Sequence, residues 1–95
     1  LFRLKKILED EFRSKRNEIT TPQRRSEFRD QLLEKYSYMV GTYFDTLDIR
    51  YTSNEYEQKR NITHAYAMVT FPQRSKITII EIDVNERAYQ ADLDE

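Results

Sequence analysis

The last third of this chain contains two strand-like runs separated by a short polar break. The first run ends at Phe71, the break covers residues 72–76, and the second run covers residues 77–84. This pattern predicts a β-hairpin. The second run carries five large aliphatic residues in eight positions, namely Ile77, Ile79, Ile80, Ile82 and Val84. A strand with one solvated face alternates apolar and polar residues, so this run requires cover on both faces or another chain along its edge.

Helical patterns fill the first half of the chain. Apolar residues at helical spacing predict a first helix: Leu4, Ile7, Leu8 and Phe12. Thr21 is a capping residue and Pro22 suits the first position of a second helix, which we expect over residues 22–40. Gly41, the only glycine, is expected to end that helix in a left-handed conformation.

The apolar period then changes from helical to two. We expect a first strand over residues 47–52, a polar loop over residues 53–61, and further strands over residues 62–71 and 76–85. This order predicts an α+β fold in which two helices cover one face of a three-stranded, mostly antiparallel sheet. The last strand is then available for donation to a neighbouring subunit, and residues 86–95 form an extended acidic tail.

The composition limits the classes of protein that fit. With 95 residues, the chain is expected to form a single domain with a small core that gains stability from contacts with neighbouring chains. It starts at Leu1 rather than methionine, so we expect an excised segment of a larger chain. The absence of cysteine excludes disulfides, a thiol nucleophile and thiolate metal ligands. No apolar run approaches the roughly 20 residues of a membrane span.

The charges are unevenly distributed along a chain whose net charge is −1. Residues 1–42 hold ten basic and seven acidic side chains, a net charge of +3, whereas residues 43–95 hold six and ten, a net charge of −4. The densest basic cluster contains Arg13, Lys15, Arg16, Arg24 and Arg25. Such a cluster is either a solvated face or a contact for an acidic surface. The near-neutral total argues against nucleic acid as an obligate partner.

Residues that carry enzyme chemistry are few. His64 is the only histidine, so no second histidine can complete a metal site or a nucleophile relay. Glu81 and Asp83 share a strand face, where they either perform acid–base or metal chemistry or protect an apolar strand. The seven tyrosines suit core and interface packing, or stacking on nucleic acid. We therefore expect no enzyme, no cofactor and no metal site.

Five short segments carry a further signal, in the order helix, helix, strand, strand, strand. They are residues 1–4, 24–29, 49–54, 67–75 and 76–82. Together they resemble the C-terminal region of contractile tail sheath proteins. These proteins form the outer sleeve of myophage tails, bacteriocin-like contractile particles and the type VI secretion apparatus. The resemblance spans nearly the whole chain.

The resemblance implies the inner, tube-facing domain of a sheath subunit, which polymerises around a central tube and contracts to drive it. Residues 77–84 would be donated to a neighbouring subunit, and main-chain hydrogen bonds would link the copies head to tail into a helical assembly. The basic cluster would face the tail tube protein. The implied location is the virion, or the bacterial cytoplasm for a secretion sheath.

Two other functions remain open. The first is a tail-terminator, a baseplate component or another oligomeric adaptor, which would form a closed ring of defined mass. The second belongs to a different class, a small nucleic-acid-binding module that uses the arginines and tyrosines. A steep salt dependence of binding would indicate that module.

Overall fold

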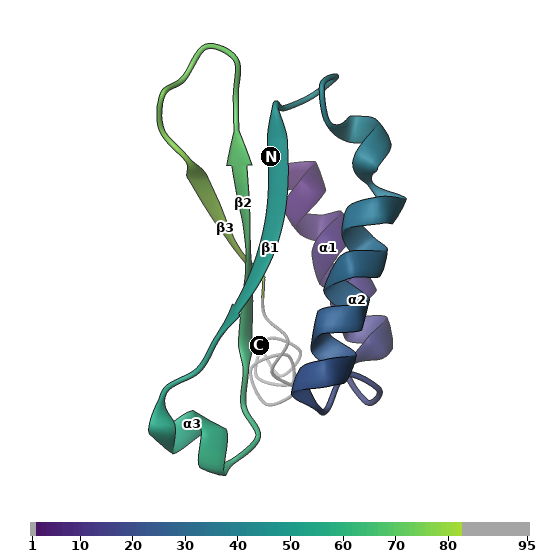
Figure 1. Ribbon diagram of the computed structural model, residues 1–95, viewed down its shortest axis with the longest axis vertical. Coiled ribbons are helices and arrows are strands. Elements are labelled where there is room, and N and C mark those ends of the chain that lie inside the picture. Colours follow the sequence, from purple (N-terminus) through teal and green to yellow (C-terminus); the bar gives the residue numbers. More distant parts are fainter. Residues whose placement is uncertain (1, 83–95) are drawn as a thin grey trace, which may run out of the picture.

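Two helices cover one face of a three-stranded sheet in the computed structural model, which describes residues 2–82 (Figure 1). The elements are α1 (Phe2–Lys15), α2 (Pro22–Lys35), η1 (Ser37–Met39), β1 (Thr46–Thr52), α3 (Glu55–Lys59), β2 (His64–Thr70) and β3 (Thr78–Ile82). The strands pair antiparallel in the order β1-β2-β3. α1 packs against β3 and α2 packs against β1, so the predicted α+β fold is confirmed.

One stripe of α1 forms the centre of the molecule. Leu4, Leu8 and Phe12 recur every four residues, lie on one face of the helix and are buried. Beyond the helix, the N–H groups of Glu18 and Ile19 both donate to the Lys15 carbonyl, at 2.8 and 3.1 Å. These bonds close the helix with its own main chain, as expected of a polar run that cannot continue the apolar stripe.

The start of α2 lies where the sequence predicts it. Thr21 is the capping residue, and its hydroxyl oxygen accepts a hydrogen bond from the Arg24 N–H at 3.2 Å. Pro22 occupies the first helical turn, where its missing N–H costs nothing. Phe28 and Leu32 then face the sheet and are buried.

The end of α2 differs from the prediction. The helix ends at Lys35 rather than at residue 40, and the chain continues as the 3₁₀ segment η1. The Ser37 hydroxyl donates to the Glu34 carbonyl at 2.8 Å. A serine that bonds the main chain of the last turn competes with the helix, which favours an early end. Gly41 has the expected left-handed conformation, with φ of 86°, but it follows η1 instead of the helix.

A short helix replaces the loop expected over residues 53–61. The Asn54 side chain caps α3 by accepting from the Glu57 N–H at 2.8 Å, and the Glu57 carboxylate accepts from the Asn54 N–H at 3.0 Å. This reciprocal capping box satisfies two donors of the first turn, which stabilises a helix of only five residues. The Asn-x-x-Glu spacing in the sequence was the signal for it.

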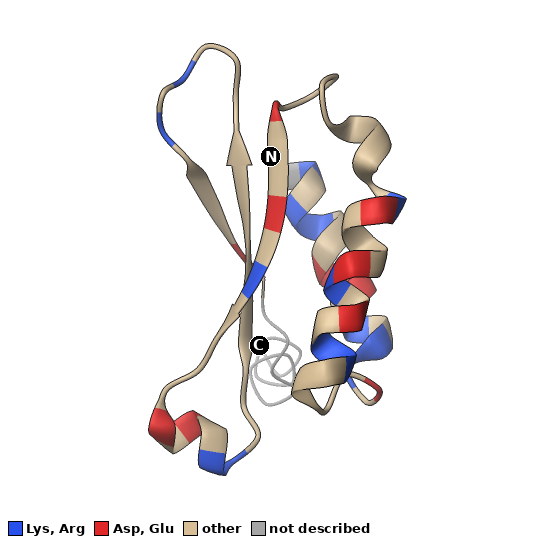
Figure 2. Cartoon of the chain, in the orientation of Figure 1, with Lys and Arg blue, Asp and Glu red and all other residues tan. Residues whose placement is uncertain are grey.

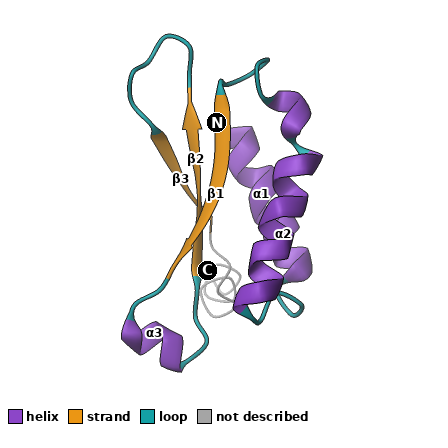
Figure 3. Ribbon diagram, viewed as in Figure 1, coloured by secondary structure: helices purple, strands orange, loops and turns teal. Residues whose placement is uncertain are grey.

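Alternation along the strands determines which residues face the helices. Three cross-strand rows face them. They are Leu47, Val69 and Thr78, then Ile49, Ala67 and Ile80, and then Tyr51, Ala65 and Ile82. The central position is an alanine in the last two rows, which leaves space for the helix side chains. β2 and β3 both start later than predicted, at His64 and Thr78, and the loop between them extends beyond the strands (Figure 3).

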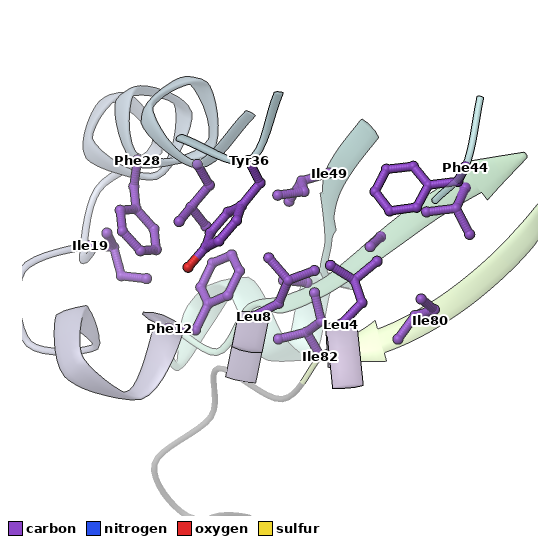
Figure 4. Packing of buried hydrophobic residues seen from close by; sticks show 14 residues of the cluster. Leu4, Leu8, Phe12, Ile19, Phe28, Tyr36, Phe44, Ile49, Ile80 and Ile82 are labelled. Atoms are coloured by element: carbon purple, nitrogen blue, oxygen red, sulfur yellow. The ribbon is translucent and has the colours of Figure 1, made fainter. Parts of the chain in front are cut away.

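The core lies between the two helices and this face of the sheet (Figure 4). Its buried residues come from both helices, from the segment after each of them and from all three strands. They are Leu4, Leu8, Phe12, Ile19, Phe28, Leu32, Tyr36, Phe44, Ile49, Ala65, Ala67, Val69, Ile80 and Ile82. Phe12 lies at the centre, with its ring 5.1 Å from that of Phe28 and 6.1 Å from that of Tyr51, both edge to face.

Candidate interaction surfaces

The aliphatic residues of the last strand are divided between two environments. Ile80 and Ile82 are 7% and 1% exposed and belong to the core beneath α1. Ile77 and Ile79, in contrast, are 53% and 60% exposed. Val84 lies outside the described residues. Of the four aliphatic residues of this run that the structure describes, the helices therefore cover two and the other two face solvent.

The exposed face of the sheet carries different side chains at its two edges. The register aligns Ile79 on β3 with Met68 on β2 and Asp48 on β1. In the next row, Glu81 is aligned with Tyr66, and Arg50 follows on β1. Figure 2 shows charged residues on β1 and on the helices, whereas β2 carries none. The β1 edge thus carries Asp48 and Arg50, whereas the β3 edge carries Glu81 next to the row of an exposed isoleucine.

The main chain of β3 is open along one side within the described part of the protein, because β3 is the last strand of the sheet. Residues in an antiparallel strand direct their N–H and C=O groups alternately toward and away from the paired strand. The Glu81 carbonyl accepts a hydrogen bond from Lys5 Nζ on α1 at 3.1 Å, which indicates that it is directed away from β2. Ile79, two residues earlier, then directs its own main-chain groups to the open edge.

The opposite edge of the sheet is better protected. The Ile49 N–H on β1 donates to Asp48 Oδ1 at 2.9 Å, so a side chain already occupies this outward donor. Asp48 also binds Arg50 Nε through its other oxygen at 2.9 Å. Charged side chains along an edge discourage pairing with another chain. At Ile49, β1 is therefore less suited to strand addition than β3 is at Ile79.

Residues of the predicted basic cluster line two different grooves, Lys15 and Arg24 in one and Arg25 in the other. Lys15 binds Glu18 at 3.3 Å, and Arg24 donates to the Glu18 carbonyl at 3.5 Å, so these two bases lie together beside an acid. Arg13 is paired with Asp10 at 3.8 Å along α1. Arg25 lies in a different groove, which it lines together with Arg29 and Arg50.

That second basic group is a feature that the sequence analysis missed. Arg25 and Arg29 are four residues apart and therefore share a face of α2, which was the available local signal. Arg50 comes from β1, and no local pattern connects it with α2. Only the packing of α2 on β1 brings the three arginines to the same groove.

A carboxylate links the two long helices at the core boundary. Glu11 on α1 accepts hydrogen bonds from the Tyr36 hydroxyl and from Lys35 Nζ, the latter at 2.6 Å. Burial acts to raise the pKa of Glu11, but the bonds from Lys35 and Tyr36 and the nearby positive charges outweigh it and hold this pKa below 4.5. Burial, followed by the bond to Glu11, raises the pKa of Tyr36.

Replacement of Glu11 by glutamine is expected to lower the free energy of unfolding by about 1–2 kcal/mol, because charge-assisted hydrogen bonds to two groups are lost. The loss is expected at neutral pH, where the carboxylate is ionised. Folding lowers the pKa of Glu11. The ionised carboxylate therefore stabilises the fold above a pH of about 4.5, and this stabilisation is lost as the pH falls through the lower pKa of the folded state. Urea unfolding across this pH range measures both effects.

The exposed pair of Glu18 and Lys15 provides the control, since Glu18 is 64% exposed. Replacement of Glu18 by glutamine should change the free energy of unfolding by no more than about 0.5 kcal/mol. A Glu11→Gln curve that stays parallel to the parent curve down to the most acidic pH would contradict the assigned role of Glu11.

His64 has a structural partner. Its Nε2 atom contacts Glu57 Oε2, which connects β2 to α3. The hydrogen bond from the Asn54 main chain, followed by the bond to His64, lowers the pKa of Glu57. Within residues 2–82, no three histidine, aspartate or glutamate side chains form a group that could hold a metal ion. Asp83, which was considered together with Glu81, lies outside the described residues.

The tyrosines are dispersed over the molecule. Tyr51 donates its hydroxyl proton to the Arg25 carbonyl at 2.8 Å, and burial raises its pKa to about 12. Tyr38 and Tyr43 are exposed near η1, whereas Tyr56 lies beneath the guanidinium of Arg60, 3.6 Å from the ring centre. These rings do not line one strand face.

Comparison with protein-family models, curated proteins and solved structures finds no match. Among the helices of the described region, none has the length and apolar character needed to cross a membrane.

Proposed function

We propose that this chain is a structural assembly subunit that pairs the open edge of β3 with a strand of a neighbouring copy. The observation that carries the proposal is the exposed Ile79 on an edge strand whose main-chain groups at that position face outward. A strand added there would satisfy those groups and cover the isoleucine. Strand addition of this kind uses main-chain hydrogen bonds for affinity and side-chain contacts for specificity.

Two favourable terms would offset the cost of association at this edge, namely apolar burial and main-chain hydrogen bonds. Burial of the exposed parts of Ile77 and Ile79 would contribute about 1–2 kcal/mol each, at about 25 cal/mol per Å². Each added main-chain hydrogen bond would contribute about 1 kcal/mol more. The Lys5 ammonium occupies one edge acceptor and is 41% exposed, so an incoming N–H can replace it.

The specific assembly is a contractile tail sheath, and the sequence resemblance supports this part of the proposal. In that assembly the residues of β3 connect subunits head to tail, and the result is helical because such contacts do not close on themselves. The basic residues Arg13, Lys15 and Arg24 would contact the tail tube protein.

Sedimentation and negative-stain electron microscopy of the purified chain test the proposal. We expect filaments or tubes that grow with protein concentration. A closed ring of defined mass would indicate the terminator, baseplate or adaptor function instead. A species that stays monomeric at every concentration would contradict assembly through β3, and salt-sensitive retention of single-stranded nucleic acid by that monomer would indicate the binding module.

A further inference from the structure

A groove lies between the first turns of α2, the end of β1 and α3, and every charged residue that lines it is an arginine. These residues are Arg25, Arg29 and Arg50. Ser26, Ser53 and Gln58 add hydroxyl and amide groups to the lining. The groove lies on the β1 side of the sheet, and β3 is at the other edge. A ligand in this groove would therefore bind independently of the proposed assembly.

Two of the arginines are held in place by bonds that leave donors available. Arg29 donates through Nη2 to the Ser26 hydroxyl at 3.2 Å and through Nε to Asp30 at 3.2 Å. Arg50 donates through Nε to Asp48 at 2.9 Å. Because a guanidinium group carries five N–H donors, each of them retains donors for a ligand.

The third arginine supplies uncompensated charge. Within the described part of the chain, no carboxylate forms an ion pair with Arg25. Its main chain is held by the Tyr51 hydroxyl, which donates to the Arg25 carbonyl at 2.8 Å. Burial raises the pKa of Tyr51, the charges of Arg25 and Arg29 act against this rise, and the charge of Asp30 adds to it, so charges of both signs are near this hydroxyl.

The main chain of β1 adds a second kind of contact. The Ile49 N–H faces the open side of β1, since it bonds the Asp48 side chain rather than β2. By the same alternation, the main-chain groups of Tyr51 face that side, and Tyr51 lines the groove. An extended peptide can therefore pair with both the N–H and the C=O of Tyr51, whereas an inorganic anion can only accept from the N–H.

We infer that this groove binds an extended acidic segment of a partner protein, whose carboxylates are held by Arg25, Arg29 and Arg50. The three arginines favour an anionic ligand, and the outward main-chain donor and acceptor of Tyr51 favour an extended peptide over a phosphate group. Planar carboxylates match the fork of a guanidinium group and accept two parallel hydrogen bonds from it. Binding weakens as salt increases, because the contacts are exposed ion pairs.

Fluorescence anisotropy with a labelled peptide of alternating aspartate and threonine tests this inference on the full chain. The variant R25Q/R29Q/R50Q is expected to bind at least about tenfold more weakly at low salt. The matched control R3Q/R74Q/K76Q removes the same number of charges from exposed positions that do not line the groove and should change binding by less than about twofold. The same peptide with asparagine in place of aspartate should not bind.

Three results would overturn the inference. One is an absence of binding by the parent chain at low salt. Another is an equal loss in the control variant, since this would indicate attraction to net charge alone. The third is binding of polyphosphate or single-stranded DNA without binding of the aspartate peptide, which would assign the groove to phosphate. Circular dichroism checks the fold of each variant, and R25Q alone, with an expected loss of about threefold or more, replaces the triple variant if that variant unfolds.

Discussion

Replacement of Phe12 by alanine is expected to lower the free energy of unfolding by about 3–5 kcal/mol, the largest loss of any single substitution considered for this protein. Phe12 is completely buried and contacts the rings of Phe28 and Tyr51 edge to face. Its removal opens a cavity where α1, α2 and β1 meet. A chain of this size has a total stability of about 5–14 kcal/mol, so much of that stability is lost.

Urea unfolding monitored by circular dichroism measures this effect. Tyr43→Ala is the matched control, because it removes an aromatic ring that is 63% exposed and should change stability by no more than about 0.5 kcal/mol. Phe12→Leu should cost less than Phe12→Ala, since it fills part of the cavity. If Phe12→Ala and Tyr43→Ala had equal effects, Phe12 would not be at the centre of the core.

Replacement of Ile79 by proline is expected to prevent assembly while the subunit remains folded. Proline removes the N–H of residue 79, which we assign to the open edge of β3, and its ring obstructs an incoming strand. The ladder between β2 and β3 does not use that donor, so the stability of the subunit should change by no more than about 1 kcal/mol. The concentration needed for assembly should rise at least about tenfold.

A second substitution at the same position separates main-chain pairing from side-chain adhesion. Ile79→Thr keeps the N–H and the preference for a strand but removes apolar surface, so it should weaken assembly less than Ile79→Pro. Sedimentation measures the assembly and urea unfolding measures the stability. If Ile79→Pro assembled like the parent chain, strand addition at β3 would be excluded. Deletion of residues 77–95 is a poorer test, because it also removes Ile80 and Ile82 from the core.

Local rules were sufficient for much of the fold. The start of α2 depends on Thr21 and Pro22, which act on their own helix turn, and the prediction was correct within one residue. The end of α2 was misplaced because the apolar stripe continues past Lys35, whereas Ser37 bonds back to the helix there. The α3 helix was missed because it carries no apolar stripe, although its capping box was visible in the sequence.

The sequence by itself determined the order of the two long helices and the three strands, the apolar stripe of α1 and the apolar excess of the last strand. These properties follow from apolar periodicity and turn chemistry, which operate over a few residues.

The tertiary structure alone decided which side chains share a groove and which strand edge is exposed. The packing of α2 on β1 groups Arg25 with Arg29 and Arg50, while Lys15 and Arg24 lie beside Glu18. The packing of α1 on β3 buries Ile80 and Ile82 and leaves Ile79 at an open edge. Such groupings join residues distant along the chain, and no local pattern encodes them.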